Sequence, residues 1–257
     1  MGLPIFATLV GVTVRELVRS KLLYNLLVFA VLFIGASLFV AQLTIGDWEY
    51  IIIDMGLVAT ELVGVLVAVL IGVSVLAGEI ERKTIFPVLA RPIGRGTFLL
   101  GRYTGLVAIL AVNTALMTLV LHAVLSLAAY PPKATTLTAA GLIFVELALI
   151  AAVALFFSSF TTPVLASAFS LSFYLIGHLL ADVRAYGHRS ESSAAKTVTE
   201  AVYRILPDLE LFNLKSQSAN RLPVPDGFVA PSVLYGVLYT AAVLALAILV
   251  FRKRDLK

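Results

Sequence analysis

Six long runs of apolar residues constrain this chain more than any other feature. An α-helix needs about 20 mostly apolar residues to cross the hydrocarbon core of a membrane. Charged residues make up 13% of the chain, about half of their share in a typical soluble domain. The sequence therefore predicts an all-α membrane protein with six transmembrane helices, at residues 22–41, 55–77, 103–127, 139–157, 164–180 and 232–250. The fifth run is the shortest.

Lys and Arg residues gather on one side of these expected spans. Twelve of the 19 lie before the first span, between the second and third, or after the sixth. The short loops of the other side contain a single base, Lys133, and the first of these loops is acidic. Because cytoplasmic loops carry an excess of positive charge, we expect both the N-terminus and the C-terminus to be cytoplasmic.

Two segments outside the spans have helical patterns of their own. Residues 1–21 predict a helix in the membrane interface, with apolar Phe6, Leu9, Val10 and Leu17 in the headgroup boundary and Arg15 and Arg19 at the lipid phosphates. Residues 181–231 form a long extracytoplasmic segment in which six acids balance six bases. Within it, helical spacing predicts an amphipathic helix at the outer surface, broken near Pro207, with an apolar side formed by Val198, Val202, Ile205 and Leu209.

Several kinds of chemistry are excluded by composition and spacing. The chain has no Cys, and its three His residues (His122, His178 and His188) are scattered, so we expect no metal site. The stretch Gly96–Tyr103 has the outline of a phosphate-binding loop, but Arg102 and Tyr103 replace the required Lys and hydroxyl residue. We therefore expect no catalytic residues, no cofactor, no nucleotide site and no nucleic-acid partner.

Two acids and one amide lie inside the expected spans. Glu61 and Glu146 each sit about 10 Å below the same membrane boundary, at a rise of about 1.5 Å per residue. Asn113 lies midway along the third span. Intramembrane acids are costly and usually face protein or water. Glu61, Asn113 and Glu146 are thus candidates for a substrate path, and the alternative is that they are hydrogen-bonded in helix packing.

The second span carries a small residue at every fourth position, namely Gly56, Thr60, Gly64, Ala68 and Gly72. Such a face allows another helix to approach closely. We expect it to serve packing, and a helix placed in this way can also act as a lever between the outer side and the loop that follows.

A role as a positively charged membrane anchor does not explain all of that loop, residues 78–102. Glu79 and Lys83 are spaced for an i,i+4 ion pair. Thr84 is a plausible N-cap, and Pro92 ends the element. Between them, Ile85, Val88 and Leu89 offer an apolar face. The sequence predicts a short helix at the cytoplasmic membrane surface that docks a partner.

Five stretches of the chain resemble one known family. They are "TVRELVRSKLLY", "GEIERKTIFPVLARPIGRGTFLLGRYTG", "FFSSFTTPVLAS", "ILPDLELFNL" and "FRKRDL". In their order and spacing they resemble the membrane subunits of ABC-2 type transporters, and most closely the subgroup named after the permease for multi-copper enzyme maturation. The resemblance covers the whole chain. Because the sequence has no strong linker, low-complexity tract or internal repeat, we expect a single domain, 1–257. No copper ligands accompany it, so copper is not carried over.

The resemblance implies a permease that moves an unidentified substrate. It also implies a multi-pass location in the bacterial inner (plasma) membrane, a second permease copy as partner, and a separate cytoplasmic ABC ATPase that supplies the energy. The loop after the second span would be the coupling element. Together with the residues of the predicted docking helix, the expected coupling residues are Glu79, Glu81, Arg82, Lys83, Thr84, Ile85, Val88, Leu89, Pro92 and Arg95.

Two other functions fit the same residues. One is a membrane scaffold or assembly protein that docks cytoplasmic partners without transporting anything. The other is an intramembrane enzyme, for which Glu79 and Glu81 lie unfavourably at the membrane edge. Transport requires a polar cavity or groove between protomers, whereas a scaffold requires none.

Overall fold

The computed structural model describes residues 2–43, 47–81, 94–131, 133–190 and 192–253. Within these ranges all regular secondary structure is helical, which confirms the predicted all-α class. The elements are α1 (Gly2–Val18), α2 (Lys21–Gln42), α3 (Trp48–Leu66), the π-helix η1 (Val67–Ile71), α4 (Gly72–Glu81), α6 (Arg95–Leu127), α7 (Ala134–Ser158), α8 (Pro163–His178), α9 (Leu180–Arg189), α10 (Ser193–Ile205), the 3-10 helix η2 (Leu209–Phe212), α11 (Lys215–Ala219) and α12 (Val229–Lys253).

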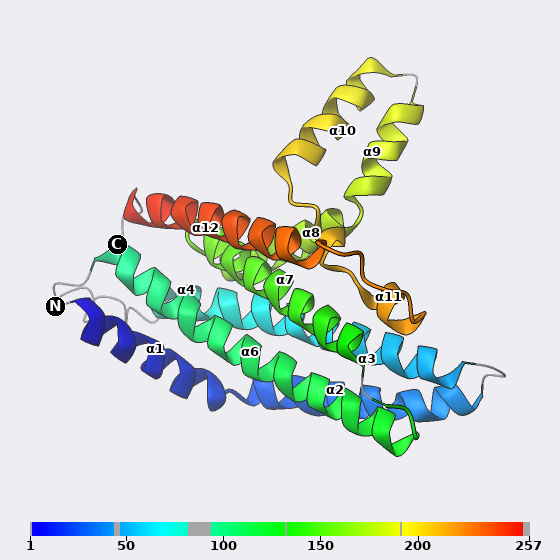
Figure 1. The fold of residues 1–257 in the computed structure, drawn as a ribbon. Coiled ribbons are helices and arrows are strands. Elements are labelled where there is room, and N and C mark those ends of the chain that lie inside the picture. Colours follow the sequence, from blue (N-terminus) through cyan, green and yellow to red (C-terminus); the bar gives the residue numbers. More distant parts are fainter. Residues whose placement is uncertain (1, 44–46, 82–93, 132, 191, 254–257) are drawn as a thin grey trace.

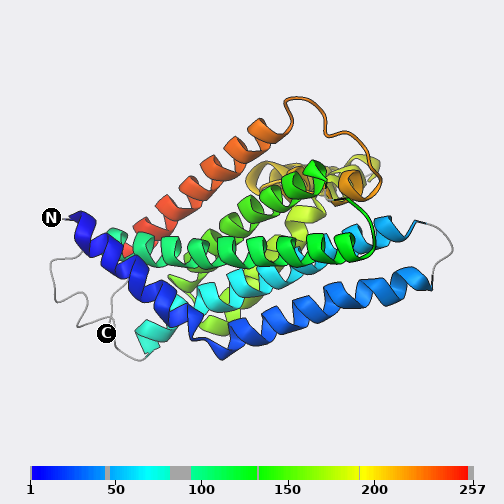
Figure 2. The same ribbon diagram turned by 60° about the horizontal axis from the view of Figure 1, so that its bottom comes forward.

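The long helices α2, α3, α6, α7 and α12 lie side by side in an elongated bundle (Figures 1 and 2). We call the end at which α6 begins and α12 finishes the basal end, and the end at which α3 and α7 begin the distal end. The first helix, α1, lies at the basal end.

Five helices in the described ranges are long and apolar enough to cross a membrane: Lys21–Gln42, Trp48–Leu76, Arg95–Leu127, Ala134–Ser158 and Val229–Lys253. Helix α8 and the start of α9, Leu180–Gly187, meet the same criteria only as a pair, with a bend of 65° between them. This broken pair contains the expected fifth span, and it begins at Pro163, a residue suited to the first turn of a helix.

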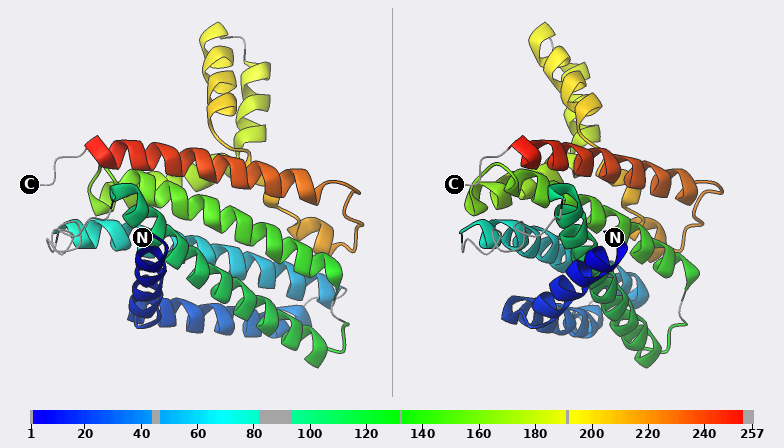
Figure 3. Two further views of the ribbon diagram at one scale, coloured as in Figure 1. Left: turned by 60° about the vertical axis from the view of Figure 1, so that its left-hand side comes forward. Right: turned by 90° about the vertical axis from the view of Figure 1, so that its left-hand side faces the viewer.

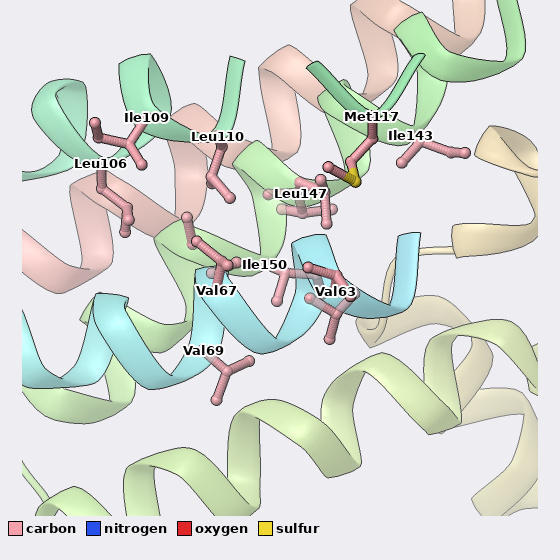
Figure 4. Packing of buried hydrophobic residues seen from close by; sticks show 14 of the residues in the cluster. Val63, Val67, Val69, Leu106, Ile109, Leu110, Met117, Ile143, Leu147 and Ile150 are labelled. Atoms are coloured by element: carbon pink, nitrogen blue, oxygen red, sulfur yellow. The ribbon is translucent and has the colours of Figure 1, made fainter. Parts of the chain in front are cut away.

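The second span is a continuous helix of three pieces, α3, η1 and α4, and its small-residue face is used inside the chain. A Cβ added to Gly56 would lie 2.4 Å from Leu121 of α6, and one added to Gly64 would lie 2.3 Å from Leu147 of α7. The packing predicted for this face is thereby confirmed. Figure 4 shows Val63 and Val67 of the same helix among buried residues of α6 and α7.

Helix α1 packs along the basal part of α6. A Cβ added to Gly105 of α6 would lie 2.6 Å from Thr13 Cβ, so the two backbones approach closely. Leu17 is buried and Leu9 packs on the core. The sequence predicts these two side chains in the headgroup boundary, and the structure instead places them against the bundle because α6 offers glycines there.

Helices α9 and α10 form a hairpin that stands away from the bundle (Figure 3). Arg184 of α9 bonds through Nε to Glu200 of α10 at 3.2 Å. Helix α10 ends before Pro207, as the sequence predicts, with Val198 and Ile205 exposed. The last residue of the expected apolar side, Leu209, is not on this helix, because it belongs to η2 and is fully buried in the bundle.

Candidate functional site

A buried charged cluster lies where α3, α7 and α8 meet. Glu61 comes from α3 and Glu146 from α7, and both are at most 3% exposed. His178, the last residue of α8, reaches both of them. Its Nε2 is 2.8 Å from Glu146 Oε1 and 3.3 Å from Glu61 Oε1. The two acids that sequence analysis placed at the same depth are thus brought together by a histidine.

Two further residues complete this cluster through Glu61. The Tyr174 hydroxyl donates to Glu61 Oε1 at 2.6 Å. Lys215 Nζ, from α11, donates to Glu61 Oε2. Tyr174 and His178 are four residues apart, so they share one face of α8, and their rings meet edge to face. We call Glu61, Glu146, Tyr174, His178 and Lys215 the Glu–His cluster.

The Glu–His cluster is connected to the surface through the other side of His178. His178 Nδ1 lies 3.4 Å from Glu210 Oε2, and Glu210 is half-exposed. Glu210 also accepts from the Asn213 amide at 2.8 Å and donates its backbone N–H to Asp208. Burial raises the pKa of Asp208 above its ordinary value, although this hydrogen bond opposes the shift.

The charges in the Glu–His cluster balance. Both ring nitrogens of His178 face carboxylate oxygens, which only accept when ionised, so an imidazolium that donates from both nitrogens fits this geometry. With that ring and Lys215, two cations face the buried carboxylates of Glu61 and Glu146, and the ring also faces the half-exposed carboxylate of Glu210. Buried charges are tolerated when they are paired and hydrogen-bonded in this way.

The same residues offer a possible set of metal ligands. One ligand atom each of Glu61, Glu146 and His178 lies within 4.8 Å of the others. However, Lys215 donates to Glu61 and the His178 ring lies within 3.3 Å of both carboxylates, so both acids already have basic partners within the described residues. The expectation of no metal site therefore stays a prediction, although the scattered histidines of the sequence gave no sign of this grouping.

Asn113, the third candidate for a substrate path, lies elsewhere. It faces α2 across a cavity of about 150 Å³ that Leu23, Tyr24 and Leu27 also line. Both amide atoms of Asn113 are buried without a hydrogen-bond partner among the described residues. The structure therefore brings Glu61 and Glu146 together and places Asn113 at a separate cavity.

The distal end carries a second ionic group around Glu49, at the start of α3. Lys133 Nζ and Arg221 Nη2 both donate to its carboxylate, the latter at 2.6 Å. Because Lys133 precedes α7 and Arg221 follows α11, this group holds three separate segments of the distal end together.

Residues of the expected coupling element lie mostly outside the described residues. Glu79 and Glu81 fall in the last turns of α4. Arg82, Lys83, Thr84, Ile85, Val88, Leu89 and Pro92 fall in the range 82–93, outside the described residues. Arg95 begins α6, and its Nη1 donates to the backbone oxygens of Phe251 and Arg252 at 3.1 and 3.0 Å.

Another basal arginine was not a candidate in the sequence. Arg102 is 5% exposed, and its Nη1 donates to Thr13 Oγ1 and Glu16 Oε2, each at 3.0 Å. Arg95 and Arg102 thus link α6 to the end of α12 and to α1. The basal helices are held by these contacts at the side from which the predicted coupling loop extends.

An all-helical chain with five or six candidate spans and a buried ionic cluster among them defines a multi-pass membrane protein. A family model described as ABC-2 family transporter protein matches residues 8–256, nearly the whole chain. The chain therefore belongs to the ABC-2 family of transporter proteins. No curated protein matches the sequence. The copper-related subgroup stays a prediction.

Proposed function

We propose that this chain is the membrane permease subunit of an ATP-driven transporter and moves an unidentified substrate with energy from a separate ABC ATPase. The Glu–His cluster is the observation that supports this proposal most strongly. Buried ions are expensive inside a membrane and mark functional paths more often than packing does. Here two buried carboxylates meet the partly buried His178 and Lys215 at the bend of a broken span, where a change in helix position changes their pairing.

The second span connects this cluster to the coupling loop. Glu61 lies 20 residues before Glu81 in one continuous helix, which corresponds to about 30 Å along the axis. An uninterrupted helical segment of this length connects movement of the loop to Glu61, with the π-helix η1 between them. We propose that ATP binding to the partner displaces the loop, and that the cluster then opens and closes the distal side, as in alternating access.

Charge supports one orientation of the bundle. The described bases of the basal end include Arg15, Arg19, Arg95, Arg252 and Lys253. Following the positive-inside rule, we propose that the basal end faces the cytoplasm of a bacterial cell. In this orientation the loop of residues 82–93 meets a cytoplasmic ATPase, and two permease copies form the transport unit.

The test is a coupling measurement. The chain is co-expressed with the ABC ATPase encoded beside it, and ATP hydrolysis is measured in proteoliposomes with wild type and with the double variant Glu81→Ala/Arg82→Ala. We expect the double variant to lose complex formation or permease-dependent ATPase activity. The control is Glu200→Ala/Arg204→Ala, which removes an acid–base pair on α10, and with it the contact of Glu200 with Arg184, in the hairpin that stands away from the bundle; it should leave both unchanged.

Failure of the two chains to co-purify would overturn the proposal, and so would full coupling in the Glu81/Arg82 variant. A stable complex in which the permease never changes the rate of ATP hydrolysis would instead favour the scaffold function.

A further inference from the structure

The second span contains one irregular turn, η1 (Val67–Ile71), between α3 and α4. A π-helix closes its turn with i→i+5 hydrogen bonds, so this turn holds one residue more than an α-helical turn does. The five side chains of η1 are all apolar, and four of them are buried. Figure 4 shows Val67 pointing toward α6 and Val69 pointing to the opposite side of the helix. Because π-turns inside longer helices occur frequently at functional sites, the extra residue calls for a reason.

The glycines of the second span show what the extra residue does to the helix. Residues four apart in an α-helix drift by about 40° around the axis, so in a regular helix Gly72 would point about 160° away from Gly56. Gly56 faces α6 and Gly64 faces α7, as this drift predicts. A Cβ added to Gly72, however, lies 3.1 Å from Leu106 of α6 and 3.2 Å from Ala154 of α7. The extra residue removes about 100° of rotation and thereby returns Gly72 to the packed side.

The pieces of the second span on the two sides of η1 are held by different partners. Before η1, Glu61 belongs to the Glu–His cluster and accepts from Tyr174. After η1, the Ser158 hydroxyl at the basal end of α7 donates to the backbone oxygen of Val73 at 3.2 Å. Glu61 lies six residues before Val67, which is less than two helical turns. A movement of α4 along the second span therefore reaches Glu61 through η1.

The residues of η1 suit a turn that changes its place along the helix. Such a migration exchanges i→i+5 hydrogen bonds for i→i+4 bonds one at a time, so the backbone groups stay paired, and each residue passed rotates by about 100°. No polar side-chain contact of η1 has to break, because its five side chains are apolar. The Ser74 hydroxyl donates to the backbone oxygen of Ile71 at 2.9 Å, so the last carbonyl group of η1 has a donor outside the backbone.

We propose that η1 is a movable joint in the second span. When its extra residue migrates toward Glu61, the residues that it passes rotate, and the pairing of Glu61 in the Glu–His cluster changes. The joint itself follows from the packing of the second span. Its consequence for transport rests on the proposed function, in which α4 transmits the movement of the coupling loop, and the joint converts that movement into a rotation at Glu61.

Deletion of Leu70, which is 36% exposed, tests the joint in the purified chain, because an α-helical turn then replaces η1 while both flanking pieces keep their contacts. We expect this variant to melt at or above the temperature of wild type. Backbone hydrogen exchange of residues 63–75, followed by mass spectrometry, should become about tenfold slower. The matched control is deletion of Leu62, which is 49% exposed in the regular part of α3. It turns one piece of the helix by about 100° against its partners and should lower the melting temperature.

The coupling assay with the ABC ATPase separates the joint from the transport function. In proteoliposomes, the chain without Leu70 should keep its complex with the ATPase but stimulate ATP hydrolysis about tenfold less than wild type does. Melting as low as that of the Leu62 deletion, unchanged exchange of residues 63–75, or full stimulation without Leu70 would each rule out the joint. If wild type itself does not stimulate hydrolysis, the proposed function fails, and the melting and exchange measurements still decide whether η1 is a joint.

Discussion

At the scale of single residues, Glu61 is the centre of the Glu–His cluster. It accepts hydrogen bonds from Tyr174 and Lys215 and lies 3.3 Å from His178 Nε2, whereas the contact described for Glu146 is with His178 alone. Loss of the Glu61 charge therefore leaves the partly buried Lys215 without its counter-ion. Removing one partner of a buried pair is more damaging than removing both.

We predict that Glu61→Gln lowers the free energy of unfolding by about 3 kcal/mol, and that adding Lys215→Gln recovers part of this loss. The free energy of unfolding in detergent is measured by circular dichroism for wild type, the two single variants and the double variant. These four values form a double-mutant cycle. Glu200→Gln, which removes the charge from two surface ion pairs, with Arg184 and Arg204, should change stability by less than about 1 kcal/mol. Additive losses in the cycle would show that Glu61 and Lys215 do not interact.

The Gln variants also separate the two interpretations of the cluster. If Glu61 and Glu146 form part of a path, Glu61→Gln and Glu146→Gln should abolish transport-linked ATPase stimulation even in a folded, ATPase-bound complex. Unchanged stimulation in such a complex would leave packing as the role of both acids.

At the scale of elements, the docking of α1 on α6 depends on close backbone approach. Gly105 faces Thr13 Cβ and lies 3.3 Å, measured from an added Cβ, from the backbone oxygen of Val10. Arg102 adds its contacts to Thr13 and Glu16 beside it. A backbone oxygen moves aside less easily than the end of a flexible side chain. An added methyl group at Gly105 therefore forces α1 and α6 apart.

Gly105→Ala should therefore destabilise the protein by about 1–3 kcal/mol, the usual cost of overpacking. The measurement is thermal unfolding in detergent, combined with limited proteolysis at α1, which should become faster as the helix detaches. Gly35→Ala is the matched control, because an added Cβ there meets nothing within 4 Å. Equal melting temperatures for the two variants would contradict the close approach of α1 and α6.

At the scale of the whole molecule, the two ends of the bundle differ in charge. The basal end is basic, and at the distal end the ion pairs of Glu49 with Lys133 and Arg221 hold three segments together. The proposed orientation assigns the first to the cytoplasm and the second to the outer side. The chain contains no Cys, so single cysteines can be introduced without any other change.

We predict that Leu222→Cys, exposed at the distal end, reacts with a membrane-impermeant maleimide in intact cells. Lys253→Cys, exposed at the basal end, should react only after the membrane is opened. Labelling is followed by gel shift, and full labelling of both sites after permeabilisation is the control. The reverse pattern would invert the orientation and place residues 82–93 out of reach of a cytoplasmic ATPase.

Much of this fold could be predicted from local properties of the sequence. The apolar runs gave the class and the spans, and the small residues from Gly56 to Gly72 gave a close-packing face that Leu121 and Leu147 occupy. The broken span could not be foreseen, because the apolar run of residues 164–180 continues across the bend after His178. Leu209 was assigned to the wrong element, because its helical spacing was extended across the predicted break near Pro207, beyond which it belongs to η2.

Local sequence is enough to identify a helical membrane protein here, because the length and hydropathy of each run depend only on neighbouring residues. It also predicted an orientation from the distribution of Lys and Arg. Only the tertiary structure brought Glu61, Glu146, His178 and Lys215 together, across separations of 32 residues from Glu146 to His178 and 154 from Glu61 to Lys215. Such a cluster depends on how helices rotate and pack against one another, and no local pattern in the chain records that.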